Sequence, residues 1–113
     1  MLEFDGRFRQ GSILFVNTKW CGYSRDAVPI LEKVSDTFGN AIPVYDVDGD
    51  IWREFLSLKM HDSAPRTYPT ILFIGSNGEV STFEDERSVE NIVAWACALA
   101  GHHGRISACP TIQ

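Results

Sequence analysis

Apolar positions along the chain fall first into a short strand-like run and then into a helical period. The apolar, β-branched run Ser12–Asn17 predicts a buried strand. Over Gly22–Phe38 the apolar residues recur at intervals of three and four, which predicts one face of a helix that Gly39 ends. Pro29 lies inside this pattern and predicts a kink, because proline removes one helical hydrogen bond.

The second half of the chain predicts a strand, a short helix, a loop, a hairpin and a last helix. Asn77-Gly78 lies between two apolar runs, which is the strongest short-range signal for a hairpin. Ser88 is a favourable N-cap for the last helix, and Gly101 is placed to end it. These elements are the strand Ile42–Val47, a helical stretch opened by Gly49 and Asp50, the loop His61–Arg66, the hairpin strands Thr70–Ile74 and Glu79–Phe83, and the helix after Ser88.

This order of elements predicts an α/β fold. Two strands joined by a helical crossover should be parallel, and the antiparallel hairpin then completes a mixed sheet flanked by helices. The length of 113 residues suits one domain, residues 1–113, with a core over about residues 12–101. Residues 102–113 show no periodicity, and we expect them to form a mobile tail.

Charge and hydropathy exclude several classes of partner. A net charge of -5 lacks the positive field that draws proteins to phosphate backbones, so no nucleic acid is expected. No apolar run reaches the roughly 20 residues that cross a bilayer, so no membrane is expected either. The first residues do not form a signal peptide, which makes a cytoplasmic location the default expectation. The sequence does not specify the oligomeric state.

The candidate chemistry centres on Cys21, which lies where the first strand leads into the first helix. Unpaired N–H groups and the positive end of the macrodipole favour a thiolate at a helix start, so the pKa of the thiol should fall. The thiolate is the form that attacks disulfide sulfur. Cys21 is therefore a candidate nucleophile.

The other two cysteines, Cys97 and Cys109, carry weaker expectations. Cys97 lies near the apolar stripe of the last helix and is expected to be a packing residue. Cys109 is expected to be an incidental surface cysteine in the tail, and a distant resolving or dimerising thiol is the alternative. His102 and His103 with these cysteines fit no zinc spacing, so no metal site is expected.

The segment Trp20-Cys21-Gly22-Tyr23-Ser24, the helix proline Pro29 and the later Tyr68-Pro69-Thr70 together resemble the thioredoxin superfamily. The chain is most similar to the catalytic domain of protein disulfide isomerases, over about residues 12–101. The resemblance implies a thioredoxin fold. It also implies that Pro69 is a cis-proline facing Cys21 and that the backbone of Tyr68 binds extended peptide. By the same resemblance Trp20 shields the thiol and Arg87 can approach it and favour the thiolate. A core-packing Trp20 and a solvated Arg87 are the alternatives.

Two positions depart from the family pattern. Ser24 replaces the usual second cysteine, and Phe15 replaces the acidic residue that lies under the active site. Both losses concern the resolution of mixed disulfides, so their joint occurrence favours a native Ser24. An engineered trapping substitution at Ser24 is the alternative.

The leading hypothesis is thiol-disulfide exchange of the disulfide-isomerase kind, in which Cys21 forms mixed disulfides and Ser24 occupies the second catalytic position. The expected partners are protein or peptide thiols and disulfides, with glutathione as a further candidate, and no cofactor is expected. One alternative is a redox-poor binding or retention module that keeps the fold and the peptide groove. Another is a single-cysteine glutaredoxin-like protein, although the glycine pair and acidic residue that hold glutathione there have no counterpart here.

Overall fold

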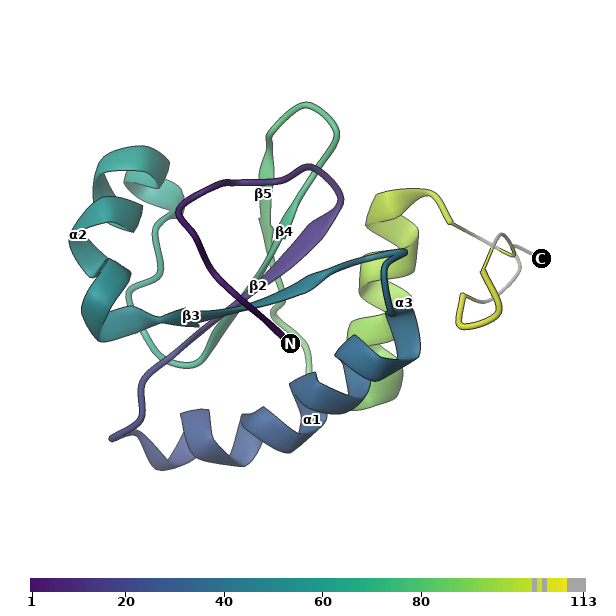
Figure 1. Ribbon diagram of the computed structural model, residues 1–113, viewed down its shortest axis with the longest axis horizontal. Coiled ribbons are helices and arrows are strands. Elements are labelled where there is room, and N and C mark those ends of the chain that lie inside the picture. Colours follow the sequence, from purple (N-terminus) through teal and green to yellow (C-terminus); the bar gives the residue numbers. More distant parts are fainter. Residues whose placement is uncertain (103, 105, 110–113) are drawn as a thin grey trace.

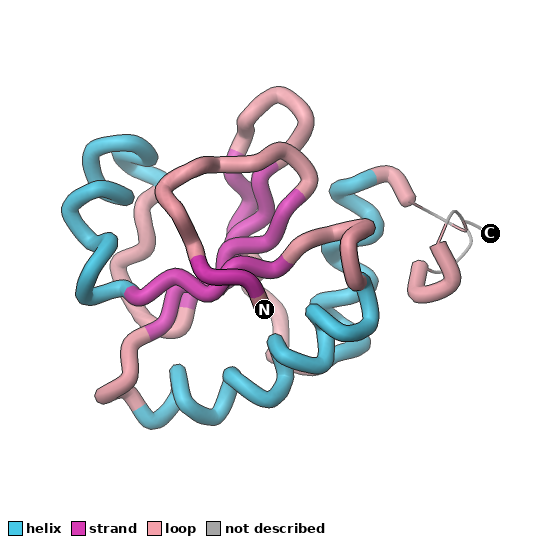
Figure 2. Tube along the Cα trace, in the orientation of Figure 1, coloured by secondary structure: helices cyan, strands magenta, loops and turns pink. Residues whose placement is uncertain are grey.

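A mixed five-stranded sheet forms the centre of the molecule, with strand order β1-β3-β2-β4-β5. The computed structural model describes residues 1–102, 104 and 106–109. Figures 1 and 2 show the strands crossing the middle of the molecule with helices around them. The strands are β1 (Leu2–Glu3), β2 (Ser12–Asn17), β3 (Val44–Asp48), β4 (Thr70–Ile74) and β5 (Val80–Thr82), and the helices are α1 (Gly22–Phe38), α2 (Gly49–Met60), the 3₁₀ turn η1 (His61–Ser63) and α3 (Val89–Ala100).

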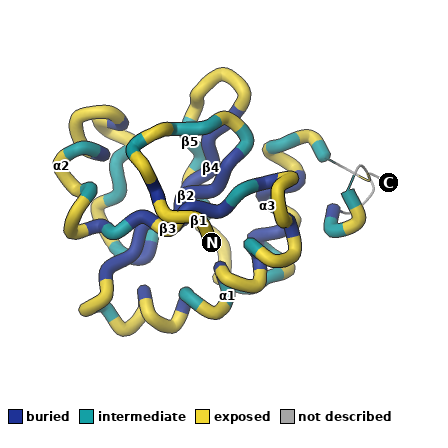
Figure 3. The backbone as a smooth tube through the Cα atoms, in the orientation of Figure 1, coloured by how far each residue is buried: buried dark blue, intermediate teal, exposed yellow. Residues whose placement is uncertain are grey.

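Strand β2 holds the sheet together. It pairs parallel with β3 and antiparallel with β4, so the predicted combination of a helical crossover and a hairpin is confirmed. Every residue of β2 is buried, as the dark central strands of Figure 3 show. Because side chains alternate along a strand, its residues contribute to two separate cores.

One core lies between the sheet and helices α1 and α3, and the other lies between the sheet and α2. Ile13 and Phe15 of β2 contribute to the first core, and Leu14 and Val16 to the second. Figure 1 shows the same division, with α1 and α3 together on one side and α2 apart from them. The predicted α/β fold with helices on both faces of a mixed sheet is therefore correct.

Several element boundaries follow from local chemistry. Helix α1 spans its predicted residues, and Gly39 follows it with a positive φ of 55°. Ser88 caps α3 by accepting a hydrogen bond from the N–H of Asn91, and Gly101 follows that helix in the left-handed region. Helix α2 is capped by Asp48, whose carboxylate accepts from two backbone N–H groups.

Three strands differ from the sequence-based expectation, of which β5 differs least, since it spans Val80–Thr82 instead of Glu79–Phe83. The short strand β1 was not predicted, and it pairs with β3 at the edge of the sheet. Strand β3 begins at Val44 instead of Ile42, because the intervening Pro43 has no N–H to donate to a neighbouring strand. The carbonyl of Pro43 still accepts a hydrogen bond from the N–H of Ile13.

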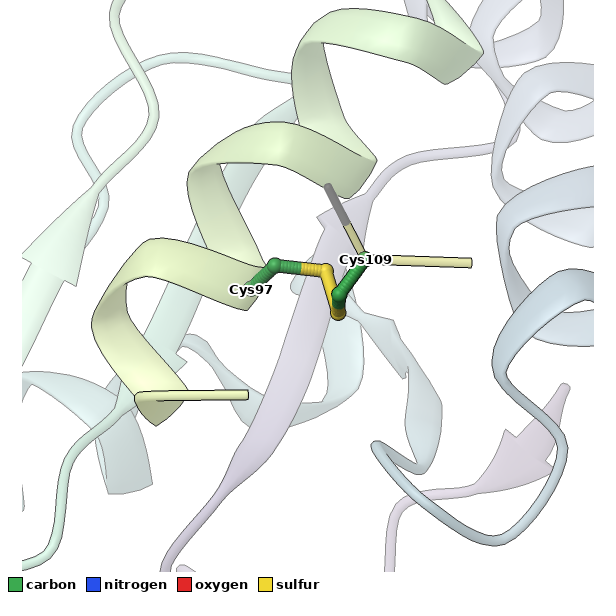
Figure 4. The surroundings of a disulfide bond; sticks show 2 residues. All are labelled: Cys97 and Cys109. Carbon is green, nitrogen blue, oxygen red and sulfur yellow. A yellow bond between two sulfur atoms is a disulfide. The ribbon is translucent and has the colours of Figure 1, made fainter. Parts of the chain in front are cut away.

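Cys97 and Cys109 form a disulfide, which corrects the expectation of an incidental surface cysteine at Cys109 and adds a covalent bond to the packing role expected of Cys97 (Figure 4). Their Cα atoms are 5.6 Å apart and they are separated by 12 positions in the chain. Cys109 is only 6% exposed and belongs to the α1–α3 core, so it is not a surface cysteine. Cys97 is fully buried there, as expected of a packing residue, but it is also covalently bonded. The prediction of a mobile tail concerns residues 103, 105 and 110–113 as well, and these lie outside the described residues.

Candidate functional site

Cys21 lies at the N-cap of α1, in the connection that leads from β2 into the helix. It is the free cysteine of the described chain and is half-buried. Its thiol donates a hydrogen bond to the carbonyl oxygen of Tyr68, with 3.7 Å between sulfur and oxygen. In this protonated form the thiol does not cap the helix, so the N–H groups at the helix start remain available for a thiolate.

The surroundings of Cys21 lower the pKa of its thiol. The largest cause is the backbone N–H of Ser24, and the N–H of Tyr23 and the hydroxyl of Ser24 act in the same direction. Arg25 adds a favourable positive charge, while desolvation opposes the shift. The expected thiolate-favouring helix start is thus present in the structure.

Ser24 is fully buried one helical turn after Cys21. Its hydroxyl oxygen accepts a hydrogen bond of 3.1 Å from the backbone N–H of Thr18. The same hydroxyl lowers the pKa of the Cys21 thiol, so it connects the turn after β2 with the sulfur. A serine here therefore supplies a hydrogen bond where a second cysteine would supply a thiol.

The peptide bond between Tyr68 and Pro69 is cis, which is the geometry that the resemblance implies. Pro69 is buried immediately before β4, and Tyr68 is half-buried. The carbonyl that accepts from Cys21 therefore belongs to the residue that precedes the cis-proline. This arrangement brings two segments together that are far apart in the sequence.

Trp20 does not pack in the core, because 67% of its surface is exposed. Its indole N–H donates to both carboxylate oxygens of Asp50, at 3.2 and 3.0 Å. Its ring meets the ring of Tyr68 edge-on, with 6.4 Å between the centroids. Trp20 therefore contacts Asp50 of α2 and Tyr68, and of these two residues Tyr68 lines the same cleft as Trp20 and Cys21. Sequence reasoning missed Asp50, since no local signal indicated a contact with Trp20.

Arg87 lies away from this cluster, just before the N-cap of α3. It lines a groove with Tyr23, Asp26 and Asp85, whereas Cys21 lines a different cleft. The positive charge that lowers the pKa of Cys21 belongs to Arg25. The described contacts therefore do not join Arg87 to the thiol.

A cleft of about 750 Å³ opens beside Cys21. Its walls come from the start of α1, from the exposed side of α2 and from the segment that precedes β4. The lining residues include Trp20, Cys21, Arg53, His61, Arg66 and Tyr68.

Three further expectations concern Phe15, a metal site and a membrane-spanning helix. Phe15 is fully buried in the α1–α3 core, so an aromatic ring fills the position of the acidic residue. Among the described residues no three His, Cys, Asp or Glu side chains lie close enough together to hold a metal, and His103 lies outside that part. No helix in the same part of the chain is long and apolar enough to cross a membrane.

Comparisons with known proteins agree with this architecture. The first thioredoxin domain of mouse protein disulfide-isomerase A4 superposes with a TM-score of 0.64 and 26% identity, over 77% of this chain and 61% of that one. The J-Trx1 fragment of ERdj5 superposes with a TM-score of 0.68 over 77% of this chain, which corresponds to 40% of that fragment. Its 16% identity supports the fold alone.

Sequence comparison leads to the same family. A thioredoxin from Borreliella burgdorferi is 32% identical over 94 residues, which are 80% of this chain and 77% of that protein. The family model described as thioredoxin matches residues 6–98. With its mixed sheet, flanking helices and a thiol at the start of α1, the chain belongs to the thioredoxin family.

Proposed function

We propose that this protein catalyses thiol-disulfide exchange of the disulfide-isomerase kind through the single thiol of Cys21. The observation that carries the proposal is the position of this sulfur, at a helix start that lowers its pKa and 3.7 Å from the carbonyl oxygen of Tyr68. Members of the thioredoxin family act on protein thiols and disulfides. A cysteine-containing peptide is accordingly the proposed substrate.

The proposed reaction begins when the Cys21 thiolate attacks one sulfur of a substrate disulfide. A new bond forms between Cys21 and that sulfur, the substrate disulfide breaks, and the second substrate sulfur leaves as a thiolate. A different substrate thiolate then attacks the mixed disulfide and releases Cys21. The cycle rearranges disulfides without net transfer of electrons, so it requires no cofactor.

Release of Cys21 depends on an external thiol. Ser24 has no sulfur, and Cys97 and Cys109 are bonded to each other. A substrate cysteine, or glutathione as the small-molecule alternative, therefore resolves the mixed disulfide. Cys21 and Ser24 cannot by themselves oxidise a dithiol, because that reaction needs two sulfur atoms at the site.

The surrounding residues take supporting roles in this proposal. Ser24 donates to the thiolate, and the backbone of Tyr68 beside Pro69 binds an extended substrate peptide. Trp20 covers one side of the sulfur while its N–H is held by Asp50. The proposed contribution of Arg87 to the thiolate stays a prediction, which an Arg87→Gln variant with unchanged Cys21 reactivity would contradict.

A binding or retention module is the second candidate function, and the absence of a second thiol at the site favours it. Such a module would hold peptides in the cleft and form mixed disulfides that turn over slowly. Peptide binding that survives Cys21→Ala would support it. The glutaredoxin-like alternative would instead require uptake of iron and sulfide, which a visible absorption spectrum detects.

Recovery of activity by scrambled ribonuclease, with glutathione present, tests the proposed function. We expect the wild-type protein to accelerate recovery and Cys21→Ser to abolish the acceleration. Arg7→Gln is a matched surface control that should behave as wild type, because Arg7 is exposed and lines no part of the Cys21 cleft. Equal recovery with wild type and Cys21→Ser would overturn the isomerase proposal.

A further inference from the structure

The cleft beside Cys21 carries more positive than negative side chains, although the chain as a whole is acidic. Arg53 of α2 and Arg66 of the segment before β4 line it, and Glu54 supplies the one carboxylate among its described lining residues. The net charge of the whole chain is -5. The positive character is therefore a local property of the cleft.

Neither arginine is neutralised by a neighbouring carboxylate. Within the described part of the chain, the salt bridge that forms joins Arg9 to Asp5, and it involves neither Arg53 nor Arg66. Arg53 and Arg66 are both exposed residues. Their hydrogen-bond donors are thus free to receive a group from a bound peptide.

The groove on the other flank of the α1 start has the opposite character. It is lined by Asp26, Asp85 and Glu86, with Arg87 as the one positive side chain among its described lining residues. Tyr23 also lines this groove, while Cys21 lines the arginine-bearing cleft. A negatively charged peptide segment would accordingly be attracted to the Cys21 cleft and repelled by its neighbour.

We infer that this protein selects substrate peptides with Asp or Glu close to the reacting cysteine, whose carboxylates bind Arg53 and Arg66. This inference rests on the proposed function, because it names the substrate class of the same thiol. A guanidinium group matches a carboxylate with two parallel hydrogen bonds, which makes arginine well suited to this recognition. The two arginines come from different segments, so they can bind acidic residues at two points along a peptide.

Peptides of one design that differ only in charge test the inference. We use Gly-X-Ala-Cys-Ala-X-Gly with X as Glu, Gln or Lys, each carrying thionitrobenzoate on its cysteine as a mixed disulfide. Cys21 attacks the peptide sulfur, a bond forms between the two cysteines, and thionitrobenzoate leaves with the electron pair of the broken bond. The absorbance of thionitrobenzoate gives the rate of this reaction. We divide the rate of each peptide with the protein by its rate with mercaptoethanol, an uncharged thiol, so that differences in the intrinsic reactivity of the peptides cancel.

At low salt the Glu peptide should react about 5-fold faster than the Lys peptide, because exposed ion pairs and charge steering act together. The preference should shrink in about 0.5 M salt, where surface charges are screened. It should also shrink in the double variant R53Q/R66Q. The matched double variant R7Q/K33Q removes the same charge at exposed residues outside the cleft and should keep the preference.

Equal normalised rates for the three peptides would overturn the inference and leave the proposed function standing. A preference that R53Q/R66Q retains in full would overturn it as well, because the arginines would then not be its source. If the Gln peptide reacts no faster with wild type than with Cys21→Ser, the proposed function itself fails. The neutral peptide thus separates the two failures.

Discussion

At the scale of single residues, the hydroxyl of Ser24 joins the Cys21 sulfur to the turn after β2. Replacing Ser24 with Ala removes a group that lowers the pKa of Cys21, so that pKa should rise toward the value of about 8.5 of a free thiol. Because the thiolate is the reactive form, alkylation should become several-fold slower at pH 7. Its half-maximal rate should move to higher pH.

The measurement is the rate of iodoacetamide alkylation against pH, without reductant, so that Cys21 is the thiol that reacts. Ser35→Ala is the matched control, since Ser35 lies on the same helix but does not affect the Cys21 pKa. Identical pH profiles for wild type and Ser24→Ala would contradict the assigned role.

Ser24→Ala also leaves the buried Thr18 N–H without its acceptor, which should lower the free energy of unfolding by about 1–3 kcal/mol.

The sequence allowed Cys21 to be placed at a helix start, because a strand run, a cysteine and a helical period follow one another directly. The contacts made across the chain were not predictable in this way. Asp50 lies 30 positions after Trp20, and no periodicity links a helix start to a tryptophan in another loop. The role of Arg87 stays a prediction, because only the resemblance assigns it and the described contacts of Cys21 do not include it.

At the scale of elements, the junction of β3 and α2 supports the Tyr68 segment through a close approach at Gly49. A Cβ atom at this position would lie 2.5 Å from Cε1 of Tyr68 and 3.2 Å from Cγ2 of Thr18. Gly49→Ala should therefore displace the Tyr68 ring, lower stability by about 1–3 kcal/mol and slow exchange at Cys21. Urea unfolding and the peptide assay measure the two effects.

Gly22→Ala is a suitable comparison for stability, because a Cβ there meets no atom within 4 Å. It should be neutral or stabilising, since alanine restricts the unfolded chain. The double variant Gly49→Ala/Tyr68→Ala should lose less stability than the two single variants together, because the second substitution removes the ring that clashes. Strict additivity would show that the ring is not the source of the cost.

Elements with a strong local signal were predicted well, while those formed by pairing were not. Helix α1 and strand β2 have their predicted bounds, because a helical period and an apolar run identify them locally. Strand β1 has only two residues, and its pairing with β3 depends on the edge of a sheet that no local pattern describes. The Asp48 cap of α2 was available in the sequence, since Asp is a preferred N-cap residue.

At the scale of the whole molecule, the disulfide joins α3 to the tail that follows it (Figure 4). Figure 1 shows α3 on the right of the molecule, whereas α1 begins at the lower left. Spacing alone did not identify this pair, since a sequence separation of 12 residues matches no recurrent pattern. Thiol counting in denaturant without reductant should find one free thiol per chain, and a count of three would contradict the disulfide.

The disulfide should stabilise the fold without taking part in exchange. Closing a loop of this length restricts the unfolded chain and contributes up to about 3 kcal/mol. In a Cys21→Ser background, reduction should lower the urea midpoint accordingly, and a midpoint that does not change would contradict the stabilising role.

In a chain with Cys97 and Cys109 both replaced by Ala, Cys21 should keep its alkylation profile against pH at temperatures where the variant is still folded. That result is expected because the groups that lower its pKa all lie within residues 23–25.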